Sequence, residues 1–169
     1  THAREQSVAD IVTPLLRRGV KLLNNTAHAP MVLGDSGRIQ QILINLVSNA
    51  IKFTNKGAIT VSARVDEEEN QLVVAVEDTG LGMKEEKLNT IFGMFQQVDE
   101  ATTRKYGGTG LGLALVKTLV EAHTGTVAVA SRHGGADTGT TFTITLPLKQ
   151  PAAPAYSPIA AGAIEEENG

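Results

Sequence analysis

The sequence predicts an α+β fold, a two-layer α/β sandwich in which about three helices cover one face of a mixed, mostly antiparallel sheet. Two observations lead to this prediction. Strand-like segments come as two adjacent pairs, each joined by a short turn, which is typical of antiparallel pairing. Segments with helical periodicity stand before and between these pairs, so the helices can pack together on one side of the sheet. The 169 residues, 41% of them hydrophobic, suit one domain of ordinary size.

The first elements differ in how clearly the sequence defines them. Residues up to about 23 read as helix or linker, interrupted at Pro14. Residues 31–33 form a short apolar strand candidate, and Asp35 or Ser36 can cap the helix that follows. That helix is expected over residues 38–52, because its apolar residues follow the spacing i, i+3, i+4, i+7, i+8, i+11. They are Ile39, Ile42, Leu43, Leu46, Val47 and Ala50.

The remaining elements alternate between strand pairs and helices. Two strands are expected over residues 57–65 and 72–77, joined by an acidic turn. A short helix over 84–91 and a longer one over 111–123, apolar on more than one side, come next. Strands over 126–131 and 140–148, linked by a glycine-rich turn, complete the sheet. Beyond residue 149 the chain is rich in proline and alanine and ends in acidic residues, which is typical of a linker or tail.

Composition excludes several classes of function. The formal net charge is −3, so no basic excess draws the chain to nucleic acid or to an acidic membrane surface. The chain has no cysteine, which excludes disulfides and thiolate metal sites. No apolar run approaches the roughly 20 residues that span a bilayer. We therefore expect neither nucleic acid nor direct membrane contact among its interactions.

Two amides and a lysine share one side of the helix expected over residues 38–52. Asn45 and Asn49 are four residues apart, which places them about 40° from each other around the helix axis, and Lys52 lies on the same side. An isolated pair of this kind usually makes only local hydrogen bonds. Mg²⁺, however, prefers oxygen ligands and keeps several waters, so a single amide oxygen is a suitable partner for it.

An acidic residue with two glycines follows the strand expected over residues 72–77. Asp78 stands at the end of this strand, and Gly80 and Gly82 follow it. A carboxylate suits the exocyclic amine of adenine, and glycines let the backbone pass close to a flat ring. A capping aspartate in a glycine turn is the simpler interpretation of this motif taken alone.

The tripeptide Asp-Thr-Gly is also the signature of aspartic proteases, and it recurs at Asp137. Such enzymes pair two carboxylates, one protonated and one ionised. The two copies at Asp78 and Asp137 are too close in sequence for two protease lobes, and the second does not follow an apolar strand. We therefore reject the protease interpretation.

A glycine run opens the helix expected over residues 111–123. Residues 107–112 read Gly-Gly-Thr-Gly-Leu-Gly, and small residues before a helix leave backbone N–H groups free to bind phosphate. Their spacing matches neither the dinucleotide-binding motif nor the P-loop. A plain glycine hinge is the alternative for this segment.

Four motifs in one order carry a resemblance to a known family: Asn45 to Asn49 with Lys52, Asp78 to Gly82, Phe92 to Phe95, and residues 107–112. Together they resemble the ATP-binding catalytic domain of sensor histidine kinases, with a segment before the last motif similar to that of hybrid-type kinases. This family belongs to the superfamily that includes gyrase, heat-shock chaperone ATPases and MutL. The resemblance implies a Bergerat-type sandwich with ATP and Mg²⁺ as cofactors.

The resemblance also implies a role for each matching residue. Asn49 is expected to ligate Mg²⁺, with Asn45 lining the site and Lys52 near the phosphates, while Asp78 selects adenine. Arg104 or Lys105 on the closing loop is expected to meet the γ-phosphate, and Phe92 and Phe95 to mark the root of that loop. The remaining residues expected to contact the nucleotide are Gly80, Gly82, Gly108, Thr109, Gly110, Leu111, Gly112 and Thr140.

The amide at Asn45 separates two activities. Hydrolytic relatives usually have a glutamate there to activate water, and an amide cannot accept that proton. We therefore expect transfer of the γ-phosphoryl group to a histidine on a dimerisation domain, with Asn45, Lys52, Arg104 and Lys105 as the catalytic residues. A non-catalytic, nucleotide-dependent interaction module and a hydrolytic ATPase remain as alternatives.

The family resemblance sets expectations for partners and domain organisation. His2 and its neighbours do not match a phosphoacceptor motif, so we expect the acceptor hairpin to lie outside this chain. Residues 1–23 then read as helix or linker from that hairpin, 24–149 as the ATP-binding domain, and 150–169 as a tail or linker. The parent protein is expected to be a homodimer that passes the phosphoryl group to a receiver domain, with this domain on the cytoplasmic side.

Overall fold

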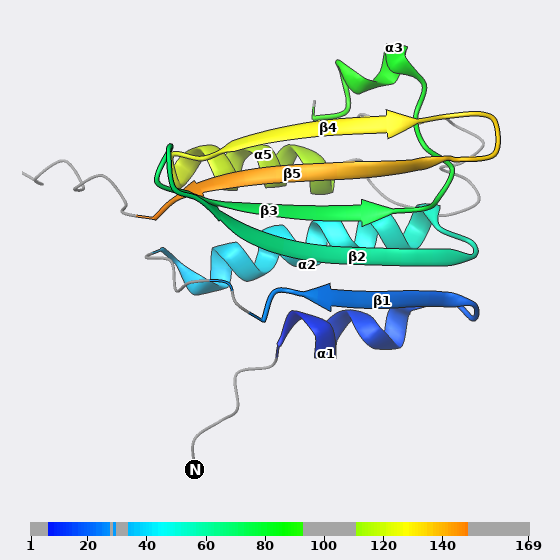
Figure 1. Ribbon diagram of the computed structural model, residues 1–169, viewed down its shortest axis with the longest axis horizontal. Coiled ribbons are helices and arrows are strands. Elements are labelled where there is room, and N and C mark those ends of the chain that lie inside the picture. Colours follow the sequence, from blue (N-terminus) through cyan, green and yellow to red (C-terminus); the bar gives the residue numbers. More distant parts are fainter. Residues whose placement is uncertain (1–6, 28, 30–33, 93–110, 149–169) are drawn as a thin grey trace, which may run out of the picture.

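A five-stranded mixed sheet with helices packed on one face forms the body of the protein (Figure 1). The computed structural model describes residues 7–27, 29, 34–92 and 111–148. The strand order is β1-β2-β3-β5-β4; β1 pairs with β2 in parallel and the other three pairings are antiparallel. The elements are α1 (Val8–Val12), a 3₁₀ helix (Thr13–Leu15), β1 (Val20–Asn25), α2 (Ser36–Phe53), β2 (Gly57–Asp66), β3 (Gln71–Asp78), α3 (Glu85–Leu88), α5 (Leu111–Ala122), β4 (Thr126–Arg132) and β5 (Gly139–Pro147).

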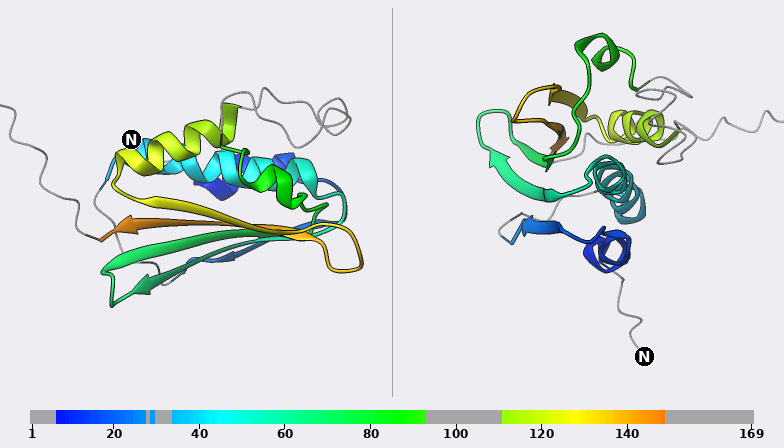
Figure 2. Two further views of the ribbon diagram at one scale, coloured as in Figure 1. Left: turned by 90° about the horizontal axis from the view of Figure 1, so that it is seen from above. Right: turned by 90° about the vertical axis from the view of Figure 1, so that its right-hand side faces the viewer.

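The predicted two-layer α+β architecture is confirmed. Figure 2 shows α1, α2 and α5 on the same face of the sheet, with the strands forming the second layer. The long helix expected over 38–52, the helix expected over 111–123 and the four strands expected between residues 57 and 148 all appear, with ends shifted by no more than two residues. The helix expected over 84–91 is a single turn, α3. Within the described ranges, no helix combines the length and the apolar character needed to cross a bilayer.

Helix α2 lies between α1 and α5 in the layer of helices that covers the sheet (Figure 2). Asp35 caps its N-terminus, with the carboxylate accepting a hydrogen bond from the Arg38 N–H. Its buried side chains follow the predicted stripe and form one core with residues of the sheet and of α5. The core residues exposed by no more than 2% include Ile42, Leu46, Val47, Ala50, Ile59, Val76, Val116, Val120, Phe142, Ile144 and Leu146. This packing fixes the face of α2 that carries Asn45 and Asn49.

The helix-or-linker interpretation of residues up to 23 is wrong for Val20–Leu23, which belong to strand β1. This strand pairs in parallel with β2, in the register Val20 to Gly57 and Leu22 to Ile59. Parallel pairing joins distant segments, so no local hairpin signal marks β1 in the sequence. The strand candidate at residues 31–33 lies outside the described residues. The domain boundaries after residues 23 and 149 remain predictions.

His123 joins the end of α5 to the start of α2. The residue is 7% exposed; Nδ1 lies 2.8 Å from the Leu119 carbonyl oxygen, and Nε2 lies 3.3 Å from the Asp35 backbone nitrogen. The carbonyl can only accept and the backbone N–H can only donate, so Nδ1 carries the proton and Nε2 accepts. The structure therefore assigns His123 a bridging role between the two helices.

We expect His123→Ala to lower the free energy of unfolding by about 2 kcal/mol, because it removes buried packing and leaves the Asp35 N–H without its acceptor. Urea unfolding followed by circular dichroism measures this change. His133→Ala is the matched control, because His133 is exposed and its truncation should change stability by less than about 0.5 kcal/mol. Equal effects of the two variants would contradict the bridging role.

Candidate functional site

A buried carboxyl group stands where β3 ends. Asp78 is 5% exposed, and its Oδ1 accepts a hydrogen bond from the Gly80 N–H at 2.9 Å. Burial raises the pKa of Asp78 to about 6; hydrogen bonds from the backbone of Gly80 and Thr140 oppose this rise, and the Glu77 charge adds to it. The ion pairs found among the described residues do not include Asp78. Near neutral pH this position therefore holds a mostly ionised, largely dehydrated acceptor that forms no ion pair with another described residue.

The loop after Asp78 is held by close backbone contacts that only glycine permits. A β-carbon at Gly80 would overlap the Phe53 carbonyl group at the end of α2, and one at Gly82 would overlap the Arg132 carbonyl group at the end of β4. Gly82 also has φ +70°, a conformation that favours glycine. In the structure, Gly80 and Gly82 therefore approach the backbone of other protein segments closely. That Gly80 and Gly82 also border a purine remains a prediction.

The predicted residues of α2 lie on its C-terminal half. Asn45 uses both ends of its amide: Oδ1 accepts from Gln41 Nε2 at 2.8 Å, and Nδ2 donates to the Gly112 carbonyl oxygen at 3.4 Å. Asn49 and Lys52 follow on the next two turns, and both are half-buried. The Asn45–Gly112 hydrogen bond brings the first motif beside the glycine motif at the start of α5.

Only part of the glycine motif and of its surroundings falls in the described residues. Leu111 begins α5, and Gly112 is exposed, with open space where a β-carbon would stand. Phe92, the first aromatic residue of the third motif, packs edge to face on Phe142 with ring centroids 6.0 Å apart. The other predicted residues of this region, Phe95, Arg104, Lys105, Gly108, Thr109 and Gly110, lie outside the described residues.

Thr140, predicted to contact the nucleotide, lies next to Asp78. It is 6% exposed and pairs directly with Asp78 across β3 and β5, so both side chains stand on the helix-covered face of the sheet. The Thr140 hydroxyl oxygen lies 2.8 Å from that of Ser131, its partner on β4. Ser131 was not among the residues predicted from the sequence. The available signal was a polar residue at an inward position of a strand whose other inward residues, Val127 and Val129, are apolar.

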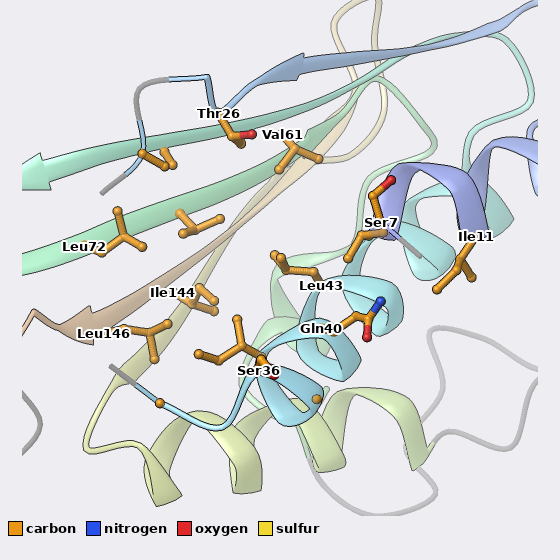
Figure 3. Close-up of a pocket in the computed structure, with 17 residues that line it drawn as sticks. Ser7, Ile11, Thr26, Ser36, Gln40, Leu43, Val61, Leu72, Ile144 and Leu146 are labelled. Carbon is orange, nitrogen blue, oxygen red and sulfur yellow. The ribbon is translucent and has the colours of Figure 1, made fainter. Parts of the chain in front are cut away.

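A separate apolar pocket of about 790 Å³ lies beside the N-terminal half of α2 (Figure 3). Its walls include Leu43 of α2, Leu72 of β3 and Leu146 of β5. None of the predicted nucleotide-site residues within the described ranges lines it, so this pocket is distinct from the group formed by Asp78, Asn45 and their neighbours.

Comparison with known proteins identifies the family. The model of histidine kinase-, DNA gyrase B-, and HSP90-like ATPases matches residues 34–150. This chain belongs to that family. The autoinducer 2 sensor kinase/phosphatase LuxQ of Vibrio harveyi is 44% identical over 151 residues, which are 85% of this chain and 17% of that protein. The chain thus spans less than a fifth of the length of this relative.

Solved structures of histidine kinases share the fold. Full-length ShkA in complex with AMPPNP superposes with a TM-score of 0.70 at 32% identity, covering 86% of this chain and 29% of that one. The catalytic domain of histidine kinase ThkA has a TM-score of 0.65 at 26% identity, covering 83% of this chain and 88% of that one. The predicted resemblance to histidine kinase catalytic domains, and with it the Bergerat-type fold, is confirmed.

Proposed function

We propose that this ATPase domain of histidine kinase type binds Mg²⁺-ATP and presents the γ-phosphoryl group to a histidine on a dimerisation domain. Membership of the family and the names of its relatives, which are sensor kinases, support this role. The ShkA structure contains AMPPNP, an analogue of ATP, which supports the same ligand class here. In the parent protein, a homodimer would pass the phosphoryl group on to a receiver domain, on the cytoplasmic side where ATP is available.

The buried Asp78 carboxylate is the observation that carries the proposal. A carboxylate removed from water can accept several hydrogen bonds, and the described residues supply Asp78 with backbone N–H donors only. The carboxylate therefore has room for a further donor from a ligand. The Thr54 hydroxyl, beside Gly80, is also buried and has no hydrogen-bond partner within the described part of the chain. The amino group of adenine, with an ordered water, would satisfy both groups.

The phosphates and the metal would lie toward Asn49, Lys52 and the start of α5. No group of three or more histidine, cysteine or acidic residues among the described positions forms a metal site, so the protein would contribute the single amide oxygen of Asn49. Mg²⁺, when bound, would offset the charge of the phosphate oxygens. Lys52 adds a positive charge, and the N-terminus of the 12-residue helix α5 adds a favourable dipole.

The proposed reaction is an in-line transfer. An imidazole nitrogen of the dimerisation domain attacks the γ-phosphorus, the bond to the β,γ-bridging oxygen breaks, ADP leaves, and the proton of the imidazole passes to solvent. Asn45 supports transfer over hydrolysis, because its amide is engaged at both ends by Gln41 and Gly112 and offers no base to activate water. Arg104 or Lys105 remains the proposed contact to the γ-phosphate.

Incubation of the full-length parent with γ-labelled ATP tests this function. We expect acid-labile, base-stable label on the protein, and Asn49→Ala should lower it at least about a hundredfold by removing the metal ligand. Asn89→Ala is the control, because Asn89 is an exposed asparagine at the end of α3 and its loss should leave labelling unchanged. ATP binding without label would indicate an interaction module, and steady phosphate release without label would indicate a hydrolytic ATPase.

A further inference from the structure

Three polar side chains stand in a row across one end of the sheet. The strand register pairs Ser131 of β4 with Thr140 of β5, and Thr140 with Asp78 of β3. Directly paired residues share a face, so all three side chains stand on the helix-covered side. The same row continues into Ile59 of β2 and Leu22 of β1, which are apolar. The polar half of the row thus ends at Ser131.

The Ser131 hydroxyl makes three hydrogen bonds and is saturated by them. Its oxygen lies 2.7 Å from the Met83 backbone nitrogen, 2.9 Å from the Gly139 carbonyl oxygen and 2.8 Å from the Thr140 hydroxyl oxygen. The Met83 N–H can only donate and the Gly139 carbonyl can only accept, so the single proton of Ser131 goes to Gly139. Two oxygens this close without a proton between them would repel each other. Thr140 must therefore donate its own proton to Ser131.

These hydrogen bonds determine whether the Thr140 hydroxyl can donate to a ligand or only accept from it. With its proton committed to Ser131, the Thr140 oxygen has only lone pairs left for any ligand beside Asp78. The neighbouring Asp78 carboxylate is also an acceptor. A ligand edge that carries an amino group can donate to both, whereas a carbonyl oxygen at the same position would face two sets of lone pairs.

We propose that Ser131 is a positioning residue for base selection: it orients the Thr140 hydroxyl as an acceptor, so that the site takes 6-aminopurine nucleotides and rejects 6-oxopurine nucleotides. This inference rests on the proposed function, because it assumes that the base lies beside Asp78. Ser131 acts through Thr140 and through Met83, whose N–H it holds, and it need not touch the base itself.

Titration of this chain with Mg²⁺-ATP and Mg²⁺-inosine triphosphate tests the proposal. Adenine has an amino group at position 6 and an acceptor at N1, whereas hypoxanthine has an oxo group at position 6 and an N–H donor at N1. In Ser131→Ala the Thr140 hydroxyl is free to rotate and donate to a carbonyl. We expect ATP affinity to fall about tenfold and the preference for ATP over inosine triphosphate to narrow by at least about tenfold. Ser131→Thr keeps the hydroxyl and should keep the preference.

The same two strands offer a matched control. Thr126 and Thr145 form another cross-strand hydroxyl pair, 2.6 Å apart, at the far end of β4 and β5. Thr126→Ala removes a similar hydrogen bond and should leave the preference for ATP unchanged. If it narrows the preference as much as Ser131→Ala does, the effect is one of general strand stability and the proposal is overturned.

Thr140→Val separates the inference from a loss of folding. It should narrow the preference as Ser131→Ala does, and the double variant should narrow it no further, because both changes act through one hydroxyl. This variant carries the test if Ser131→Ala fails to fold. If the wild-type chain binds ATP but the preference for ATP over inosine triphosphate is unchanged in Ser131→Ala or in Thr140→Val, the role of Ser131 is overturned and the proposed function stands. Wild-type chain that binds neither nucleotide overturns the proposed function as well.

Discussion

Asp78→Asn is expected to abolish nucleotide binding and, at the same time, to make the protein more stable. An asparagine keeps one acceptor oxygen, which the Gly80 N–H would hold, and it turns its NH₂ donors toward the amino group of the base. ATP affinity should therefore fall at least about a hundredfold. The folded protein, however, no longer has to hold a buried charge. We expect the free energy of unfolding at pH 7.5 to rise by about 1 to 3 kcal/mol.

The sign of this stability change follows from the pKa of Asp78. Burial raises it from 3.8 to about 6 in the folded protein, so the folded state binds a proton more tightly than the unfolded state. The stability that this proton contributes is fully present below pH 4 and is lost as the pH rises through 6. The difference between the pKa of Asp78 in the unfolded and in the folded protein corresponds to about 3 kcal/mol of stability. Below pH 6 the protonated carboxyl is also a poorer acceptor, so ATP affinity should fall there.

Urea unfolding at pH 5 and pH 7.5, combined with ATP titration, measures both effects. In Asp78→Asn the free energy of unfolding should lose the part of its pH dependence that Asp78 causes. It should exceed the free energy of unfolding of the wild type most clearly at pH 7.5. Asp137→Asn is the matched control, because it makes the same chemical change in the second Asp-Thr-Gly tripeptide, where the side chain is exposed. An Asp78→Asn protein that binds ATP with wild-type affinity would contradict the assignment of Asp78 to the base.

Periodicity was sufficient to predict most of the fold. The stripe of α2 and the β2–β3 and β4–β5 hairpins are local patterns, and each appears close to its expected position. Strand β1 was missed because its partner in the sheet is a distant parallel strand and because Lys21, Asn24 and Asn25 leave little apolar pattern. Local sequence does not encode which distant strands become neighbours.

The candidate site shows the same division between local and long-range information. Asp78 and Asn45 could be predicted as site residues because each belongs to a compact motif with a chemical reason for its residue types. Ser131 was missed, since its relation to Thr140 and Met83 depends on the register of β4 with β5 and on the turn after Asp78. The glycines of that turn were predicted for a ligand contact, and the structure adds a second reason for them, the close packing of the loop on α2 and β4.

Gly82→Ala is expected to cause the largest loss of stability among the changes considered. The backbone at Gly82 has φ +70°, which costs a non-glycine residue about 1 kcal/mol. The added β-carbon would also overlap the Arg132 carbonyl group, which is backbone and cannot rotate away. Relief of this overlap requires the loop to move away from β4 and breaks the hydrogen bond from Met83 N–H to Ser131. We expect the free energy of unfolding to fall by at least about 3 kcal/mol.

Gly134→Ala separates the contribution of packing from that of backbone conformation. Gly134 has φ +76°, nearly the same as Gly82, but a β-carbon there would meet nothing within 4 Å. Its substitution should therefore cost only about 1 kcal/mol, the conformational part. Urea unfolding of both variants measures the difference, and ATP titration should show weakened binding for Gly82→Ala alone, because only that change displaces the loop beside Asp78. Equal losses of stability in the two variants would mean that the contact between the loop and β4 does not hold the Asp78 turn in place.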